Sequence, residues 1–389
     1  MESISSIITK KPFCDKLVTG NFIERVSGVL DEYFFGAKNP PEIALITTEK
    51  DYLFIGKTLK DRLTDVGKSV TVFVFERIEG VEFLECYDAA VIVGDADYAG
   101  IVCVKARSKP VVIVSSSLVF SPAFSFVYET SPITKEKGDL YKFVLDTEIY
   151  KGLRRKDFAD GYAFTASMCL LKFECAVLRA FGEKIPDEVD DLLDSAYKTL
   201  SYINKENIVG VITVAGIYIM NALWLYPKIL DTGAVYCGKI LSCMTGLNKY
   251  ECTLASFGPL LAFFKAYLKL NKDIAIVPFV REDAEKLAER LRVDSLEVYE
   301  KIDFLSSDKI ALRKTGLKDC KNIVSIIDET ETRLKELKVR YANVYNARHK
   351  RGECDKKDVL KALTLSGVLA KGSVGLMYYD GFLSALAQI

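Results

Sequence analysis

The sequence has a single histidine, His349, among its 389 residues. Because imidazole is the commonest ligand of catalytic metals in proteins, this count excludes a metal site built from two or more histidines. An excess of charge is also missing, since 53 Lys and Arg residues balance 53 Asp and Glu residues. The chain therefore lacks the one-sided positive field that binding to nucleic acid or to an anionic membrane surface requires, and we expect neither partner.

Disulfide and metal spacings are missing among the ten cysteines, which are scattered through apolar segments such as Met168–Leu171 and Val102–Val104. This distribution is typical of a reducing compartment, and it predicts a cytoplasmic protein. The N-terminal stretch MESISSIITKKPFC has no long apolar run, and apolar stretches elsewhere are interrupted. We therefore expect no targeting signal and no segment that spans a bilayer.

The first part of the chain alternates short apolar runs with segments of helical spacing. Continuous apolar strands separated by helices are typical of a parallel sheet that is covered on both faces, so we expect an α/β domain over residues 1–150. The predicted strands are Ile43–Thr48, Ser69–Glu76, Ala89–Val93 and Pro110–Ser115, and the predicted helices are Lys57–Val66 and Tyr98–Arg107.

Residues 151–389 are expected to form a second, all-helical domain. Long apolar-periodic segments occur at Phe158–Phe181, Glu188–Ile203, Ile208–Leu225, Thr232–Leu247, Cys252–Leu270 and Asp283–Leu291. Asp328–Arg351 is predicted to be one long helix, with the acids of DETE at its positive end, RHKR at its negative end and Gly352 after it.

The run Val144–Ala163, VLDTEIYKGLRRKDFADGYA, resembles a motif of the glycerol dehydrogenase, glycerol-1-phosphate dehydrogenase and dehydroquinate synthase-like superfamily. IALITTEKDYLFIGKTLKDRL is similar to that family's first strand and helix, and KPVVIVSSSLVFSPAFS is similar to a later strand and loop. VYNARHKRGECDKKDVLKALTLSGVL resembles its C-terminal helix pair. The resemblance implies a dehydroquinate synthase-like fold, in which an N-terminal Rossmann-like α/β domain for NAD(P) precedes an all-α C-terminal domain.

The family's divalent metal, held by one acid and at least two histidines, is not expected in this chain. With Gly161 in the place of the motif's glycine, the acid falls at Phe164, and the two histidines fall near Tyr236 and Phe257. A phenyl ring offers no lone pair to a metal, and a Tyr hydroxyl is an uncommon ligand.

Other residues are weak substitutes for those ligands. His349 lies among Arg348, Lys350 and Arg351, which is typical of a solvated base at a helix end. The spacings of Cys237, Cys243 and Cys252 match no compact ligand pattern, so we interpret them as small buried hydrophobes. Asp157 and Asp160 could pair in a cleft or could cap a helix.

Nucleotide binding is predicted to be impaired, because the family's glycine-rich phosphate loop appears here as Gly94-Asp95-Ala96-Asp97-Tyr98. A carboxylate about 4 Å from a phosphate is repelled by about 1 kcal/mol in water and about 4 kcal/mol at intermediate dielectric. Asp95 or Asp97 could instead cap the following helix, and Asp97 could bind a ribose hydroxyl.

Polar residues at the ends of other predicted strands are the remaining candidates for a cofactor. Thr47, Thr48 and Lys50 could contact phosphate oxygens. Ser115, Ser116 and Ser117 could form either a ligand site or a turn. Phe120-Ser121-Pro122 stands where the glycerol-1-phosphate branch has a substrate-binding His-Asp-Gly, so that contact is also missing.

Three functions follow from these observations. The first is a degenerate polyol dehydrogenase-like protein without the catalytic metal, which binds a small molecule or nucleotide or takes part in an assembly. The second is an NAD(P)-dependent oxidoreductase acting on a glycerol-like or phosphorylated polyol, with Tyr236 or Lys239 as proton acceptor, although both residues could equally serve packing. The third is a structural protein whose old cleft is filled by Phe164, Tyr236, Phe257, Phe263 and Phe264. The apolar tail GLMYYDGFLSALAQI could form a homo-oligomer interface or dock on its own domain.

Overall fold

The computed structural model describes residues 16–75, 82–94, 100–106, 109–119, 127–129, 135–138, 140–180, 183–269 and 322–345, with single positions at 285, 288, 289, 293, 358 and 362. The chain divides into two compact units. Unit 1 comprises Met1–Thr130, Thr134–Gly161 and Glu206–Pro227, and unit 2 comprises Ser131–Ile133, Tyr162–Lys205 and Lys228–Ile389. The sequence boundary at residue 150 stays a prediction.

Unit 1 is built on a six-stranded, all-parallel sheet with the order β1-β8-β5-β4-β2-β3. Its strands are β1 (Leu17–Thr19), β2 (Glu42–Thr47), β3 (Ser69–Val74), β4 (Ala89–Gly94), β5 (Val111–Ser115) and β8 (Lys142–Leu145). A separate antiparallel pair joins β6 (Val127–Glu129) to β7 (Lys135–Lys137). The four strands predicted from the sequence are confirmed.

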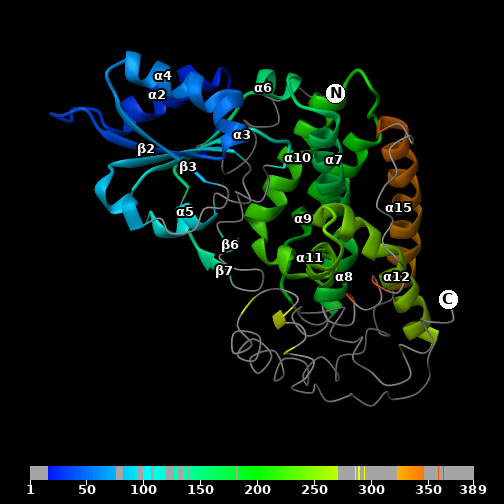
Figure 1. Cartoon of the computed structure of the whole chain (residues 1–389). Helices are drawn as coiled ribbons and strands as arrows, with labels where there is room; N and C mark the ends of the chain where they lie inside the picture. The colour runs from blue at the N-terminus through cyan, green and yellow to red at the C-terminus, as the bar shows by residue number, and fades with distance from the viewer. Residues whose placement is uncertain are drawn as a thin grey trace. The chain divides into compact units, whose positions relative to one another are not determined.

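Helices cover both faces of this sheet, which explains why its central strands are apolar throughout. α2 (Phe22–Tyr33) and α4 (Lys57–Asp65) lie on one face, and α5 (Gly100–Lys105) lies on the other (Figure 1). Between α2 and α4 the chain continues through α3 (Glu49–Asp51) and the π-helical turn η1 (Tyr52–Gly56), and the 3₁₀ turn η2 (Glu82–Cys86) precedes β4. Residues buried on both sides form a continuous apolar run, as expected for a parallel sheet.

Asp146 joins three elements of unit 1. It follows β8 and is the N-cap of α6 (Thr147–Lys151), where its Oδ1 accepts the Glu148 N–H at 2.9 Å. Its Oδ2 accepts the N–H of Phe22, the first residue of α2, at 3.0 Å. This buried carboxylate therefore caps two helix N-termini at once, where the helix dipoles favour a negative charge.

Two helices in the described part of the chain are long and apolar enough to cross a membrane by length and composition alone, so the premise that apolar stretches are interrupted too early is wrong. They are Arg155–Arg179 and α10 (Ile208–Leu225), whose most apolar windows are 94% and 67% buried inside the protein. Such burial is typical of helices that pack in the core of a folded protein. The expectation that no segment spans a bilayer stays a prediction.

The helices of unit 2 follow the predicted segments. They are α7 (Arg155–Leu170), which begins in unit 1, α8 (Lys172–Ala180), α9 (Asp187–Leu200), α11 (Gly233–Thr245), α12 (Lys249–Lys269) and α15 (Ile323–Tyr345). The short 3₁₀ turn η4 (Pro227–Asp231) leads into α11. The helix expected at Asp283–Leu291 lies almost wholly outside the described residues.

The predicted start of the last long helix is wrong. α15 begins at Ile323, and its first turn contains no acid, so the acids of DETE lie further along the helix. Two of them bind a cation of α12 instead: the Lys265 ammonium lies 2.9 Å from Asp328 and 2.7 Å from Glu331. Lateral ion pairs therefore replace the expected compensation of the helix dipole.

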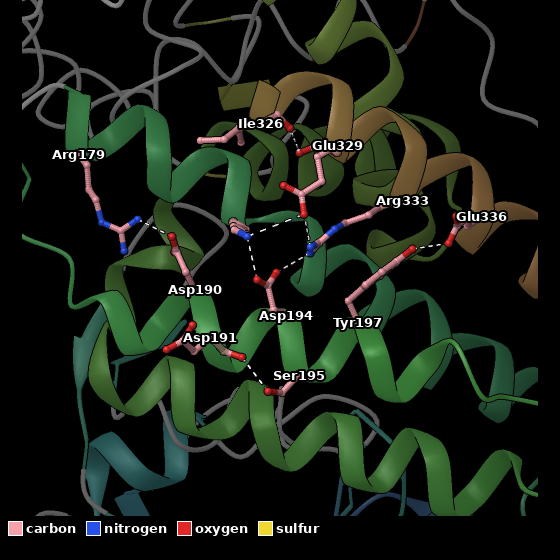
Figure 2. Close-up of polar contacts among 12 residues, drawn as sticks. Arg179, Asp190, Asp191, Asp194, Ser195, Tyr197, Ile326, Glu329, Arg333 and Glu336 are labelled. Atoms are coloured by element: carbon pink, nitrogen blue, oxygen red, sulfur yellow. Dashed lines mark hydrogen bonds and ion pairs between the residues drawn. The ribbon is translucent and has the colours of Figure 1, made fainter. Parts of the chain in front are cut away.

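An ionic network fastens α15 to α8 and α9 (Figure 2). Asp194 of α9 accepts from Lys172 of α8 at 2.8 Å and from Arg333 of α15 at 2.7 Å. Arg333 also binds Glu329, and its guanidinium lies 4.5 Å over the ring of Tyr197. Because these groups are partly shielded from water, each pair is worth more than an exposed ion pair.

The pKa values of two residues in this network, Tyr197 and Asp194, reflect their partly buried surroundings. Burial raises the pKa of Tyr197 to about 12, together with the hydrogen bond that its hydroxyl donates to the carboxylate of Glu336. Burial alone would raise the pKa of Asp194, but hydrogen bonds from Lys172 and Arg333 outweigh it and hold the pKa below its ordinary value of 3.8. Asp194 is therefore a carboxylate that the folded state stabilises in its charged form.

We predict that Asp194→Asn costs about 2 kcal/mol of unfolding free energy at neutral pH, because Lys172 and Arg333 lose their shared anion. A depressed folded pKa stabilises the fold above the unfolded pKa, and this contribution disappears as pH falls through the folded value. The gap between wild type and variant in urea unfolding should therefore narrow below about pH 4. Asp191→Asn, on the exposed side of the same helix, is the control and should show the smaller gap. A gap for Asp194→Asn that is constant down to pH 2 would contradict the assignment.

Helices α11 and α12 approach each other at Gly238. A Cβ at this position would lie 1.9 Å from the Thr253 Oγ1 and 2.7 Å from both the Lys249 carbonyl oxygen and the Thr253 amide nitrogen. The last two atoms belong to the backbone of α12 and cannot rotate away. Only glycine therefore allows this helix pair to pack as it does.

We predict that Gly238→Ala destabilises the protein by about 1–3 kcal/mol, measured by urea unfolding, because the added methyl forces α11 and α12 apart. Gly28→Ala in α2 is the matched control, since its new Cβ meets no atom within 4 Å. That control should be neutral or stabilising by up to about 1 kcal/mol, as alanine favours helix over glycine. Equal stability of the two variants would refute the close contact.

Candidate functional site

The two threonines at the carboxyl end of β2 donate hydrogen bonds from their hydroxyl groups to oxygen atoms of the protein. Thr47 is fully buried, and its Oγ1 donates to the Val93 carbonyl oxygen of β4 at 3.0 Å. Thr48 is the N-cap of α3; its Oγ1 accepts the Asp51 N–H at 3.2 Å and donates to the Asp51 carboxylate at 2.8 Å. Both hydroxyls therefore have structural roles, one between strands and one as a helix cap.

The serines after β5 form a closed turn against the end of β4. Ser115 is buried and its Oγ donates to the Ser117 carbonyl oxygen at 2.7 Å, while the Ser117 Oγ accepts the Val119 N–H at 3.1 Å. The Ser116 N–H donates to the Gly94 carbonyl oxygen at 3.1 Å. The structure thus brings Gly94 and the three serines together at one edge of the sheet, and of the two alternatives for the serines it shows the turn.

These bonds limit what the sheet edge can offer a phosphate. Phosphate oxygens need hydrogen-bond donors, and a hydroxyl has only one proton to donate. Thr47, Thr48 and Ser115 already donate theirs to protein oxygens, so among the predicted hydroxyls Ser116 and Ser117 are the better candidates. Asp95, Asp97 and Phe120-Ser121-Pro122 lie outside the described residues, and nucleotide binding stays a prediction.

Gly161 explains how α7 reaches this turn. A Cβ on Gly161 would lie 2.5 Å from the Leu118 Cβ, in the loop that carries the serines, and 3.5 Å from the Ile212 Cγ2 of α10. The glycine that aligns with the family motif is therefore required for packing in unit 1.

Asp157 is a helix cap that also binds a cation. Its Oδ2 accepts the backbone N–H of Arg154 at 3.0 Å, directly before α7, and its Oδ1 lies 3.2 Å from the Lys50 ammonium. Burial would raise the pKa of Asp157, but the hydrogen bonds from Arg154 and the charge of Lys50 outweigh it and lower the pKa. Of the two alternatives for this residue, the structure favours the cap, and it places Lys50 on Asp157.

The three residues that the sequence resemblance places at metal-ligand positions are buried in helices of unit 2. Phe164 on α7 and Phe257 on α12 are 0% exposed, and Tyr236 on α11 is 2% exposed. The ring of Phe164 packs edge-on against Tyr250 of α12, with ring centroids 4.7 Å apart. Each side chain is thus part of the apolar core, and the meeting of all three at one point stays a prediction.

The donor set of these positions does not fit a divalent metal. In the described part of the chain, no three His, Cys, Asp or Glu side chains form a group that could hold a metal ion. Cys237 and Cys252 are buried as expected, whereas Cys243 is exposed, so the prediction is wrong for that residue, which lies on the outer side of α11. His349 lies outside the described residues.

Lys239 and Tyr236 lie together one turn apart on α11. The Lys239 Nζ lies 4.8 Å from the centroid of the Tyr236 ring, and the lysine is only 8% exposed. Stacking of an ammonium on an aromatic face stabilises the positive charge. The structure therefore brings together the two residues that the sequence offers as proton acceptors, in a contact that also serves packing.

Sequence reasoning missed Glu174, a fully buried acid on α8. Its Oε1 accepts the N–H of Ala234 at 3.0 Å, in the first turn of α11. Although Thr232 occupies the N-cap position, its side chain makes no capping bond, so the glutamate supplies the anion at this helix N-terminus. The signal in the sequence is a lone acid among the apolar residues of KFECAVLRA.

The two units together define a class of fold, an α/β domain with a parallel sheet and a helical domain, as in the dehydroquinate synthase-like superfamily. The protein is similar to a solved mutant of an alcohol dehydrogenase from an archaeal halo-thermophilic Red Sea brine pool source, with a TM-score of 0.58, 12% identity and 96% coverage of each chain. It is also similar to the Escherichia coli aldehyde reductase YqhD in its substrate- and cofactor-free form, with a TM-score of 0.54, 15% identity and coverage of 96% of this chain and 97% of that one.

No family model matches the sequence, and no curated protein matches it either. At 12–15% identity the structural likeness shows the fold alone. The predicted dehydroquinate synthase-like fold is confirmed, and the sequence is identical to these neighbours at only 12–15% of aligned positions.

We predict that Glu174→Ala destabilises the protein by about 1–3 kcal/mol in thermal or urea unfolding, because the buried Ala234 N–H loses its acceptor. Glu174→Gln keeps an acceptor oxygen in the same place and should cost less. Equal losses in the two variants would show that the carboxylate charge, and not the hydrogen bond, stabilises the start of α11.

Proposed function

We propose that this protein is a degenerate member of the polyol dehydrogenase-like fold, without the catalytic metal, which acts as a non-catalytic ligand-binding or assembly protein. The observation that carries the proposal is the burial of Phe164, Tyr236 and Phe257 at the positions that match metal ligands in the resembling family. Aromatic rings packed in a core offer no lone pairs to a Lewis acid, and without one the substrate hydroxyl is not activated for hydride transfer.

The sheet edge of unit 1 supports the same reading. Of the hydroxyl groups that the sequence suggests for cofactor binding, three donate hydrogen bonds to protein oxygens, namely those of Thr47, Thr48 and Ser115. Lys50 forms an ion pair with Asp157. Among the described residues of this edge, Ser116, Ser117 and the backbone near Gly94 are the better groups for a ligand, which fits a small molecule or a nucleoside portion better than a pyrophosphate. A cytoplasmic location remains part of the proposal.

The alternative is an NAD(P)-dependent oxidoreductase with an altered site, acting on a glycerol-like or phosphorylated polyol. The observation that favours it is the buried contact of Lys239 with the Tyr236 ring. In that case Lys239 as the neutral amine, or Tyr236 as the phenolate, would accept the proton of the substrate hydroxyl as the hydride leaves for the nicotinamide.

Metal analysis of the purified protein, followed by thermal shift and turnover assays, tests the proposal. We expect no stoichiometric iron or zinc, and no oxidation of glycerol or glycerol phosphates with NAD or NADP. Adenine nucleotides and NADH serve as probes of the sheet edge in the thermal shift assay. Stoichiometric metal, or polyol turnover that a chelator abolishes, would overturn the proposal.

Variants separate the two functions. If the alternative holds, Lys239→Met and Tyr236→Phe should each abolish NAD(P)-linked turnover. Lys249→Met is the matched control, because Lys249 also lies over a tyrosine ring, at 5.0 Å from the Tyr250 centroid. Turnover that only the Lys239 and Tyr236 variants lose would establish the oxidoreductase.

A further inference from the structure

Lys109, between α5 and β5, binds three carbonyl oxygens at once. Its Nζ donates to the carbonyl oxygens of Leu84 and Glu85 at 2.7 Å each, and it also donates to the carbonyl oxygen of Tyr87. Because an ammonium carries three protons, each proton has an acceptor. The Lys109 backbone N–H donates to the Ala106 carbonyl oxygen at 3.1 Å, directly after α5. Both ends of this residue are therefore fixed.

The three oxygens belong to the C-terminal end of η2, and we call them the carbonyl site. Leu84 and Glu85 lie in η2, and Tyr87 follows Cys86, its last residue. Carbonyl groups at the end of a helix keep lone pairs that the helix itself does not use. All three oxygens lie within hydrogen-bond distance of one nitrogen, so they converge on a single point.

Neutral oxygens that converge on one point favour a monovalent cation. Backbone carbonyl oxygens replace the hydration shell of K⁺ in selective channels, and they accept from an ammonium at about 2.7–2.9 Å. Divalent cations such as Ca²⁺ and Mg²⁺ prefer sites that include carboxylates. The carboxylate of Asp88, which follows Tyr87, accepts the Glu42 N–H at 2.9 Å instead. In the described part of the chain, the partners of the Lys109 ammonium are all backbone oxygens.

We propose that the carbonyl site is a binding site for a monovalent cation of the size of ammonium, and that the Lys109 side chain supplies its resident cation. The lysine is then a tethered ligand, and its removal leaves a site for free NH₄⁺ or K⁺. A lysine that merely caps a helix also binds the last carbonyl groups. Such a cap requires no space that fits a free ion, so rescue by a free cation separates the two roles.

The carbonyl site joins two segments of unit 1 that are distant in sequence. η2 lies in the crossover from β3 to β4 and carries Phe83, whose ring stacks on Phe73 of β3 with centroids 4.0 Å apart. Lys109 precedes β5, which pairs with β4. The site thus lies at the amino ends of β4 and β5, whereas Gly94 and the serine turn lie at their carboxyl ends. Its failure would leave the proposed function untouched.

Thermal unfolding of the full chain with cation rescue tests the proposal. Lys109→Ala removes the ammonium and leaves its space empty, whereas Lys109→Met removes the charge but keeps a side chain in that space. In tetramethylammonium chloride, whose cation is too large for the site, both variants should unfold about 4 °C below wild type. Lys105→Ala, at an exposed lysine of α5, is the control and should show neither loss nor rescue.

Ammonium or potassium chloride at the same concentration should rescue only one variant. Relative to wild type in the same salts, the unfolding midpoint of Lys109→Ala should rise by about 2 °C or more, and that of Lys109→Met should not change. An equal response of the two variants would overturn the proposal and leave an ordinary helix cap. A Lys109→Ala variant that folds in none of these salts would also contradict it.

Acylation of the wild-type protein gives a second readout that does not depend on variants. Because its three protons are bound in the carbonyl site, Lys109 should react with acetic anhydride at least about tenfold more slowly than Lys105, as located by mass spectrometry. Equal rates for the two lysines in the folded protein would show that the ammonium does not reside in the site, and would overturn the proposal.

Discussion

The carboxylate of Asp146 is the interaction on which unit 1 depends. One oxygen accepts from the first turn of α6 and the other from the first residue of α2, although the two helices are more than a hundred residues apart in sequence. Two helix N-termini with unsatisfied N–H groups would otherwise meet at the end of β8, in a buried place where unpaired donors are costly. Asp146 is also the aspartate of the VLDTEIY run on which the sequence resemblance rests, and its two capping bonds give that aspartate an architectural role.

The same distinction between architecture and chemistry holds elsewhere. Gly161 keeps its place because α7 touches the serine loop, and Thr47 keeps its place because it ties β2 to β4. The residues that the resemblance places at metal-ligand positions lie in the core, with Phe164 against Tyr250 and Tyr236 beneath Lys239. Packing constrains the first group in any protein with this fold, whereas only a bound ligand would constrain the second.

Sequence reasoning could predict the strands and most helices, because a buried parallel strand such as AAVIV and an apolar helix such as α10 have patterns that few other structures share. It failed for side chains whose role depends on a binding partner that is distant in the sequence. The acids of DETE were expected to compensate a dipole, yet Lys265 on α12 binds two of them. Glu174 was missed because nothing near it in sequence indicates Ala234 as its donor. Thr48 was considered for phosphate, and only its distance to Asp51 shows it as a cap.

The contact between Gly161 and Leu118 has a consequence for how such chains can diverge. The clash that a side chain at 161 would cause is with the Leu118 Cβ itself, 2.5 Å away, and so shortening the leucine does not relieve it. The space between positions 161 and 118 therefore holds the Cβ atom of only one of the two residues. A descendant that gains alanine at 161 has to acquire glycine at 118, which would loosen the serine loop, or has to shift α7 along the sheet. In distant relatives that keep this contact, we expect glycine at one of these two positions whenever the other carries a side chain.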